Sequence, residues 1–418
     1  MKRPSGLGFI FLTLLIDILG GGLLFPVLPK FIASISHLSP GDASRHYGLL
    51  LSLYGAMQFL FAPLFGSLSD RLGRRPVLLI SLFVTGIDYL IMAVAPNLTW
   101  LYVGRILSGI TGGSITAASA YIADVSPPEK RSQNFGLIGA AFGLGFIIGP
   151  ALGGVLGAWG ERVPFWGAAG LSLANVLYGW LVLPESLSAE NRRAFSWKDA
   201  NPVGSLRMLG KYPVVWGLTG ALAASNLAMH FLSSTWVLYM TSRLGWGVRE
   251  NGLSLAAFGV VALIYQLGLA RVLLPWLGER RMMLTGLAFG VAEYLLYGLA
   301  SAGWMIYAVM PIGGLGVVSG QATQGLLSHQ VGADEQGALQ GALASLTSLT
   351  GIVGPVLGTS LFAYFTGPDA PAEVPGAAFF AAAGLNVVAL LIALRALSGP
   401  NAAGQKKISG SIDAAECA

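Results

Sequence analysis

Four ionisable residues lie deep inside long apolar stretches of the chain: Asp17, Asp88, Arg105 and Glu293. A charged side chain costs roughly 2.5–3.5 kcal/mol at the centre of a membrane helix, so such residues face a partner or a wet cavity. A carboxylate there is either paired or protonated, and it can carry a proton if the cavity opens to each side in turn. We therefore predict proton coupling by the three carboxylates, with Asp17 the first choice and Asp88 the second. The competing interpretation is a static ion pair, for example with Arg105.

A second group of polar residues within apolar stretches could contact a small molecule. A drug cavity combines an apolar wall with a few placed polar groups. Taken singly, each such residue is more often a packing residue than a ligand contact. The candidate substrate-binding residues are Gln58, Arg105, Asn226, His230, Ser233, Gln266, Gln321 and Gln324. No metal site is predicted, because the single cysteine, Cys417, excludes disulfides and thiolate metal sites.

The elements that position these residues are membrane-spanning helices. Hydrophobic residues make up 54% of the 418 residues and charged residues only 10%, whereas about a quarter of a soluble domain is charged. A span needs about 20 apolar residues to cross roughly 30 Å of hydrocarbon. We predict an all-α membrane protein with twelve transmembrane helices, over 6–28, 47–68, 77–95, 100–122, 134–158, 164–183, 213–240, 252–274, 282–302, 304–327, 337–364 and 377–397.

The basic residues predict the orientation of these spans. Of the 24 Lys and Arg residues, 18 fall in loops on one side and 5 on the other, with Arg105 left inside a span. Lys and Arg mark the cytoplasmic side, so both termini and the long polar link are predicted to be cytoplasmic. The chain then divides into an N-terminal half (1–184), a central linker (185–211), a C-terminal half (212–397) and a polar tail (398–418) that we expect to be disordered.

An internal repeat relates the two halves. An offset of 205 residues brings several separate features into register, which predicts two pseudo-symmetric six-helix halves with a transport site at their interface. In that arrangement Asp88 and Glu293 would lie on opposite walls of one cavity and attract a cationic substrate. The alternative is that their match is a relic of duplication. The matched features are Leu72-Gly73 with Leu277-Gly278, Asp88 with Glu293, Gly136 with Gly341, and Gly149-Pro150 with Gly354-Pro355.

Three motifs connect this architecture with a known family. The first cytoplasmic hairpin, Gly66-Ser-Leu-Ser-Asp-Arg-Leu-Gly-Arg-Arg-Pro76, resembles motif A of the major facilitator superfamily, and the start of the fourth span, around Arg105, resembles motif B. The glycines around Pro150 resemble motif C, which is associated with antiporters. The resemblance implies that one set of residues holds or bends the moving helices: Gly66, Asp70, Arg71, Gly73, Arg74, Asp124, Arg131, Gly149, Pro150, Gly354 and Pro355.

The resemblance narrows to the tetracycline/proton antiporters of that superfamily. It rests on Asp17 with the following Gly21–Pro29 segment, on Met57-Gln58, on Asp88-Tyr89 and on the Leu343–Pro355 segment. Those proteins export a magnesium–tetracycline chelate in exchange for a proton. The chain departs from them at Glu293, where an aspartate is usual, and in the eighth span, which lacks the family's histidine. In the second copy of motif A, Pro275 replaces the aspartate, so we expect the C-terminal gate to be the weaker one.

The leading functional hypothesis is therefore drug/proton antiport by alternating access. We expect a monomeric, multi-pass protein of the cell (inner) membrane that has no enzymatic activity, no cofactor and no nucleic-acid partner, and whose substrate arrives as a magnesium chelate. The alternative is a transporter of the same superfamily for another small solute, such as a sugar or metabolite. A non-transporting sensor or lipid-flipping protein would not need acidic residues in three spans. The sequence carries no G-x-x-x-x-G-K-[ST] loop for ATP, which favours an ion gradient as the energy source, although sodium stays open.

Overall fold

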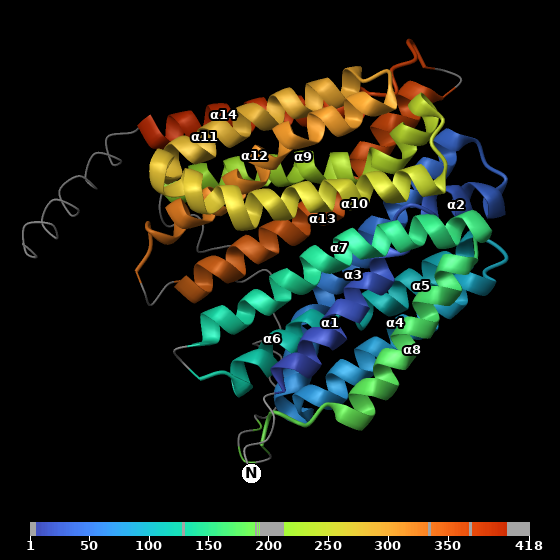
Figure 1. Ribbon diagram of the computed structural model, residues 1–418, viewed down its shortest axis with the longest axis vertical. Coiled ribbons are helices and arrows are strands. Elements are labelled where there is room, and N and C mark those ends of the chain that lie inside the picture. Colours follow the sequence, from blue (N-terminus) through green and yellow to red (C-terminus); the bar gives the residue numbers. More distant parts are fainter. Residues whose placement is uncertain are drawn as a thin grey trace, which may run out of the picture.

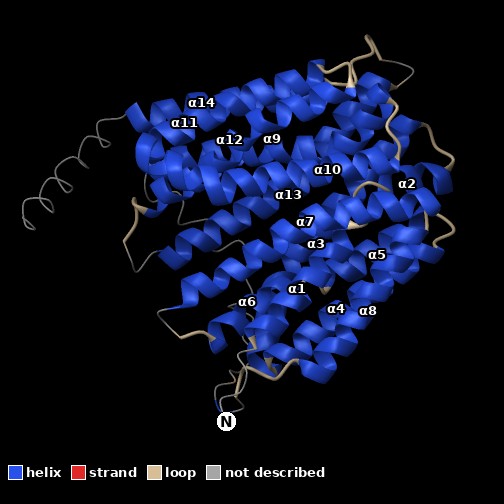
Figure 2. Ribbon diagram, viewed as in Figure 1, coloured by secondary structure: helices blue, strands red, loops and turns tan. Residues whose placement is uncertain are grey.

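The computed structural model describes residues 6–127, 130–188, 190, 192, 213–332, 336–367 and 370–398. Within these residues the secondary structure is helical, with no strand (Figure 2). The expected central linker is described only near its start, and the expected disordered tail lies outside the described residues from 399 onward. The side chain of Arg131 is likewise outside the described part of the chain.

The helices form two groups that follow one another along the chain (Figure 1). Two apolar clusters are centred on the first group and two on the second, and Val248 of the second group packs into one of the clusters of the first. The first group is α1 (Leu7–Gly22), α2 (Leu28–Ser36), α3 (Pro40–Leu72), α4 (Arg74–Val94), α5 (Leu98–Ile110), α6 (Ser114–Val125), α7 (Arg131–Trp159) and α8 (Val163–Val182). The second is α9 (Pro213–Leu244), α10 (Val248–Ile264), the π-helical turn η4 (Tyr265–Leu269), α11 (Ala270–Leu299), α12 (Gly303–Ser328), α13 (Gln336–Thr366) and α14 (Ala377–Ser398).

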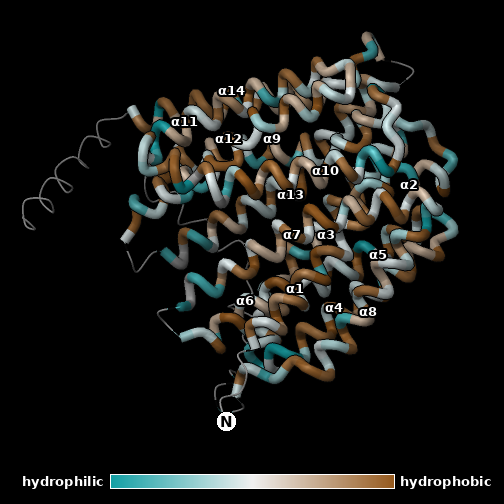
Figure 3. Tube along the Cα trace, in the orientation of Figure 1, coloured by the Kyte–Doolittle hydropathy of each residue, from teal (hydrophilic) through white to brown (hydrophobic). Residues whose placement is uncertain are grey.

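Nine helical segments in the described residues are long and apolar enough to cross a membrane, and α1 is a shorter apolar helix. Brown, apolar positions run along the helices in Figure 3. Large apolar side chains such as Trp159, Trp276 and Trp304 are exposed. Lipid-facing apolar side chains of this kind are expected when the bilayer is the solvent. The protein is therefore an all-helical, multi-pass membrane protein, and the count of twelve spans stays a prediction.

One of the expected spans is interrupted, and two others are joined. The fourth span is divided into α5 and α6 by residues 111–113, where the sequence Thr-Gly-Gly supplies two poor helix formers. The eighth and ninth spans join in one helical segment, α11, whose backbone leaves the helical region at Gly278 with φ 72° and ψ 158°. Gly73, its partner in the repeat, reverses the chain in the same way with φ 110° and ψ 159°. Both angles need a glycine, since a side chain would be strained at positive φ.

The two groups touch through glycine-lined contacts between α3 and α13 and between α7 and α10. A β-carbon on Gly154 would lie 3.1 Å from the Cα of Gly252, and one on Gly48 would lie 2.7 Å from the carbonyl oxygen of Pro355. Farther along α7, toward its first residues, a β-carbon on Gly136 would meet nothing within 4 Å. These contacts lie toward the ends of α3, α7 and α10 that we predict to be extracellular.

The contact between α7 and α10 generates a prediction. Replacing Gly252 with valine places a β-carbon 2.8 Å from the Cα of Gly154, so the two helices must separate. Overpacking of this kind costs about 1–3 kcal/mol. We expect Gly252→Val to lower the apparent Tm of the purified protein, measured by a thermal-shift assay in detergent. Gly136→Val is the matched control, and an equal loss in both variants would contradict the close contact.

Candidate functional site

Two of the predicted site residues, Gln58 and Asp17, lie against the break in the fourth span. The amide Nε2 of Gln58 donates a hydrogen bond of 3.0 Å to the carbonyl oxygen of Gly112, which lies in the break. The hydroxyl of Ser114, the first residue of α6, donates a 2.8 Å hydrogen bond to Oδ2 of Asp17 on α1. Polar side chains from α1 and α3 thus satisfy groups at the break, as the interior of a membrane protein requires.

Asp88 and Arg105 form an ion pair beside this break. Asp88 on α4 is fully buried, and its Oδ2 accepts from the guanidinium of Arg105 on α5. The guanidinium carbon lies 5.5 Å from the ring centre of Tyr54 and 6.0 Å from that of Tyr89, where a cation is attracted to the ring faces. The ion pair that competed with a coupling role for Asp88 is therefore present. Asp17 has no such cationic partner among the ion pairs of the described residues.

Glu293 is buried inside the second group of helices. Its carboxylate packs against the backbone of Gly313 on α12, and its side chain lines a cavity of about 170 Å³ between α9, α10, α11, α12 and α14. Asp88 packs in the same manner against Gly104, the glycine just before Arg105. Each carboxylate thus points at a glycine of the next span in its own group, because only a glycine leaves room for it.

This placement corrects one expectation. We predicted that Asp88 and Glu293 would face one cavity from opposite walls. Instead, the contacts of Asp88 all lie in the first group of helices and the residues around Glu293 all lie in the second. The physical reason is that a carboxylate can turn from a cavity toward a neighbouring helix when that helix offers a glycine. The repeat correctly predicted equivalent positions but not the direction of the side chains.

The remaining substrate candidates are spread over the second group. The Nδ2 of Asn226 on α9 donates a 3.2 Å hydrogen bond to the hydroxyl of Thr347 on α13. The ring of His230 packs against Gly351 and Gly354 of α13, so this histidine is a packing residue in this conformation. Ser233 follows on α9 and donates to the carbonyl oxygen of His230 at 3.3 Å.

Three glutamines complete the predicted set. Gln266 is exposed and lies in the π-helical turn η4, where Tyr265 packs against Gly314 of α12. Such turns are often found at functional sites. Gln321 and Gln324 are exposed on α12. The structure does not bring these three into contact with Asp17, Gln58 or Arg105.

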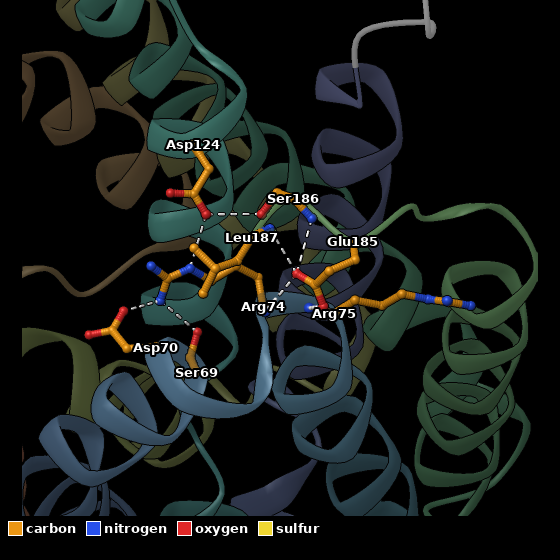
Figure 4. A network of polar contacts seen from close by, with 8 residues as sticks. All are labelled: Ser69, Asp70, Arg74, Arg75, Asp124, Glu185, Ser186 and Leu187. Carbon is orange, nitrogen blue, oxygen red and sulfur yellow. Dashed lines mark hydrogen bonds and ion pairs between the residues drawn. The ribbon is translucent and has the colours of Figure 1, made fainter. Parts of the chain in front are cut away.

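The hairpin between α3 and α4, which we predict to be cytoplasmic, forms a dense polar network centred on Arg74 (Figure 4). The guanidinium of Arg74 donates to Asp70, to the hydroxyl of Ser69 at 3.0 Å and to Oδ2 of Asp124 at 3.0 Å. Arg74 is 9% exposed. Gly66 lies close to Thr116 of α6 and Arg71 is exposed. In this conformation the network joins α3, α4 and α6 within the first group, and the gate that we predict would engage the second group only in the opposite state.

Glu185 is a member of this network that sequence reasoning missed. One carboxylate oxygen accepts from the backbone N–H of Arg74 at 2.9 Å and the other from that of Arg75 at 3.2 Å, which caps the N-terminus of α4. The hydroxyl of Ser186 also donates to Asp124 at 3.0 Å (Figure 4). A carboxylate at a helix N-terminus is favourable because the free N–H groups there carry partial positive charge. The only signal in the sequence was its position: Glu185 follows Pro184, just after the predicted end of the sixth span.

The second group carries a charge-reversed version of the pair between Arg74 and Asp124. At the offset of the repeat, Glu279 takes the place of Arg74 and His329 takes the place of Asp124. Nε2 of His329 lies 3.6 Å from Oε1 of Glu279. Because His329 is largely exposed and Pro275 occupies the position of Asp70, this contact has fewer partners than the network at Arg74. That difference supports the prediction of a weaker C-terminal gate.

The two glycine-proline motifs sit where helices within and between the groups meet. Gly149 packs on the backbone of Gly22 in α1, and Gly354 packs on His230 in α9. The carbonyl oxygens of Pro150 and Pro355 instead face glycines of the other group, Gly252 and Gly48. Each motif therefore contacts its own group on one face and the other group on the adjacent face, and its role in bending or sliding the helices stays a prediction.

Comparisons with known proteins agree on one relationship. The family model described as Major Facilitator Superfamily matches residues 10–355. The tetracycline resistance protein of class C from Escherichia coli is 41% identical over 87% of this chain and 91% of that protein. The class D protein from Salmonella ordonez is 36% identical over 87% and 90%. Among solved structures, a bacterial homolog of the human lysosomal transporter Spinster, in an inward-facing and unoccupied conformation, superimposes with a TM-score of 0.77 at 18% identity over 95% of this chain and 98% of that chain.

The capping role of Glu185 can be tested directly. Glu185→Ala removes the acceptor for two backbone N–H groups of α4 and leaves Arg74 without part of its support. Loss of an N-terminal cap costs about 0.5–2 kcal/mol. We expect a lower apparent Tm than for Glu161→Ala, which removes only a surface ion pair with Lys30. If both variants melt at the wild-type temperature, Glu185 has no capping role in solution.

Proposed function

Because this chain belongs to the Major Facilitator Superfamily, we propose that it is a secondary active transporter that exports tetracycline-like compounds in exchange for protons. The relatives named tetracycline resistance proteins cover most of both chains, which favours this substrate class over others. Export proceeds by alternating access, in which the two groups of helices rock about a site between them. The protein resides in the cell (inner) membrane as a monomer with both termini in the cytoplasm.

The observation that carries the proposal is the environment of Asp17. Its carboxylate accepts a hydrogen bond from Ser114 at a break in the fourth span, and it has no basic partner in the described ion pairs. Arg105, the basic residue that lies within the same group of spans, is already paired with Asp88. A carboxylate without a fixed counter-charge can gain and lose a proton during each cycle. When a carboxylate in an ion pair is protonated, its basic partner is left as an unpaired buried charge, which is costly. Asp17 is therefore the proton carrier, and Asp88 and Glu293 assist it.

The substrate meets polar groups from both groups of helices. Gln58 and Arg105 provide contacts from the first group, and Asn226 provides one from the second. His230 joins them only in a conformation in which it has left its packed position against α13. Tetracycline-like compounds enter as a magnesium chelate, and the negative carboxylate of Asp17 favours the cationic complex. Binding of the cationic complex and binding of a proton then compete for one carboxylate, which links drug export to proton entry.

A second candidate function is transport of another small solute by the same fold. The exposed glutamines Gln266, Gln321 and Gln324 favour it, because amide side chains suit hydroxyl-rich solutes such as sugars. A resistance profile decides between the two. The chain is expressed in a bacterial host that lacks its own drug pumps and is challenged with chemically distinct drugs. Resistance restricted to tetracycline-like compounds supports the proposal. If the expressing cells are as sensitive to every drug as the host without the gene, the alternative is favoured.

The coupling role of Asp17 gives the next prediction. Asp17→Asn keeps the shape and a hydrogen-bond acceptor but cannot carry a proton. We expect it to abolish tetracycline accumulation in everted membrane vesicles driven by an imposed pH gradient, with normal amounts of protein in the membrane. Asp42→Asn, at an exposed residue that pairs with Arg45, is the matched control and should transport normally. Normal accumulation by Asp17→Asn would remove Asp17 from the mechanism.

The proposed gating role of the Arg74 network gives another testable prediction. Asp70 pairs with Arg74 within the first group in this conformation, and we propose that it engages the second group only when the cytoplasmic side is closed. Asp70→Asn removes that second contact and should shift the protein toward the cytoplasm-open state. A partly exposed pair contributes only about 0–1 kcal/mol, but a balanced two-state equilibrium responds to that. The measurement is the rate at which a water-soluble maleimide labels a cysteine placed at Gln324 in a Cys417→Ser background. Faster labelling is expected, and an unchanged rate would speak against the gate.

A further inference from the structure

The second part of the fourth span, α6, has a polar contact at each of its two ends. Its first residue, Ser114, donates a 2.8 Å hydrogen bond to Oδ2 of Asp17 on α1. In its last turn, Asp124 accepts a 3.0 Å hydrogen bond from Nε of Arg74 on α4. The 12 residues of α6 extend over about 18 Å at the usual rise of an α-helix. This one short helix therefore connects the proposed proton carrier with the Arg74 network.

The backbone can bend directly before α6. Residues 111–113, Thr-Gly-Gly, lie between α5 and α6 and outside both helices, and glycine gives a backbone its widest choice of angles. The buried side chains nearest the start of α6 are small: Ser114, Ala117 and Ala118. Small side chains give smooth helix faces, along which neighbouring helices can approach and shift. The start of α6 can therefore move against its neighbours, and the helix carries that movement to its last turn.

The contact at the start of α6 depends on the charge of Asp17. A hydrogen bond to a carboxylate is roughly twice as strong as one between neutral groups. Gly113, the residue before α6, has no side chain to cap the helix, and a negative charge near a helix start is stabilising. Both contributions become smaller when Asp17 takes up a proton. Asp17 is only half-buried, so a proton can reach it.

Other ionisable groups around Asp17 do not take over this contact. Among the described residues, the hydrogen bond from α6 is the only one that its carboxylate accepts. Asp88 and Arg105 are paired with each other, and Tyr54 of α3 and Tyr89 of α4 interact with Asp17 only electrostatically. The helices α7 and α8 also pack against α1, and their one basic or acidic residue is the first of α7. The single acid of α6 lies in its last turn.

We propose that Ser114 is a positioning residue that couples the proton on Asp17 to the Arg74 network through α6. While Asp17 is charged, its carboxylate holds the start of α6 against α1. When Asp17 takes up a proton, α6 shifts at the break, and Asp124 in its last turn shifts relative to Arg74. A proton bound within the span thereby acts on the gate that we predict at the cytoplasmic end. This inference rests on the proposed role of Asp17 as the proton carrier and adds the residue that transmits its state.

The coupling is tested by a double-mutant comparison on the purified full-length protein in lipid nanodiscs, without drug. Spin labels on cysteines at the exposed positions Gln133 of α7 and Gln324 of α12, in a Cys417→Ser background, report the distance between the two groups of helices. Double electron–electron resonance then gives the ratio of cytoplasm-open to cytoplasm-closed protein. Asp17→Asn fixes the residue in a neutral form. It should shift the ratio several-fold toward the open state, because the protonated protein must turn inward to deliver its proton. In a Ser114→Ala background the same change should no longer shift it.

Matched variants separate this role from simple packing. Ser119→Ala removes another hydroxyl of α6, which bonds only to the carbonyl oxygen of Ile115 in the same helix at 2.7 Å, and it should keep the full response. Ser114→Thr retains a hydroxyl and should restore the response. Asp124→Asn breaks the link at the other end of α6 and should weaken the response. The proposal is overturned if Asp17→Asn shifts the ratio equally with and without Ser114, or if Asp124→Asn leaves the shift unchanged.

A second measurement keeps Asp17 in place, in case Asp17→Asn does not fold. The same distance is recorded at pH 5.5 and at pH 8, and the change between them in the parent protein should be lost in Ser114→Ala. An equal change in both proteins overturns the proposal. Accumulation of tetracycline in everted vesicles tests the proposed function separately. Because the distance measurement contains no drug, a failure of tetracycline export and a failure of the coupling through α6 can be told apart.

Discussion

The structure depends on one constraint: a charge or an open backbone group within a bilayer must find its partner inside the protein. The break between α5 and α6 exposes a carbonyl and a helix start, and Gln58 and Asp17 lie against them. Arg105 enters the same region and is neutralised by Asp88. The polar cluster of the first group of helices is thus the consequence of interrupting one helix at a pair of glycines. A transporter gains from such an interruption because it places movable polar groups where an unbroken helix would present only side chains.

The close packing of the helices depends on glycine. Gly104 and Gly313 let the two equivalent acids lie against a neighbouring backbone, and Gly154 with Gly252 lets the two groups of helices touch. In lipid, helices gain little from burying apolar surface, so close backbone contact becomes a main source of attraction. Contacts of this type are broad and smooth, and they can be broken and re-formed without unlocking interdigitated side chains. The same residues that stabilise the bundle therefore permit its halves to move.

The two groups of helices repeat their backbone more faithfully than their charges. Gly73 and Gly278 reverse the chain with the same unusual angles, yet Arg74 is matched by Glu279 and Arg105 by Met310. As a result, the first group holds two well-partnered arginines, whereas the second holds a sparse pair at the surface and a buried acid beside a cavity. The two groups therefore share a backbone plan but differ in how their charges are held.

The sequence by itself determined the class of the protein, the approximate place of its helices, the repeat, and the depth of Asp17, Asp88 and Glu293. Apolar length, charge depletion and glycine spacing are local properties, and the cost of a charge in lipid makes each exception visible. Only the tertiary structure decided which acid has a counter-charge, where Gln58 reaches, and that Glu185 caps α4. Those contacts join residues as far as 111 positions apart, and their direction depends on which neighbouring helix offers a glycine or a free N–H group, which no single stretch of sequence records.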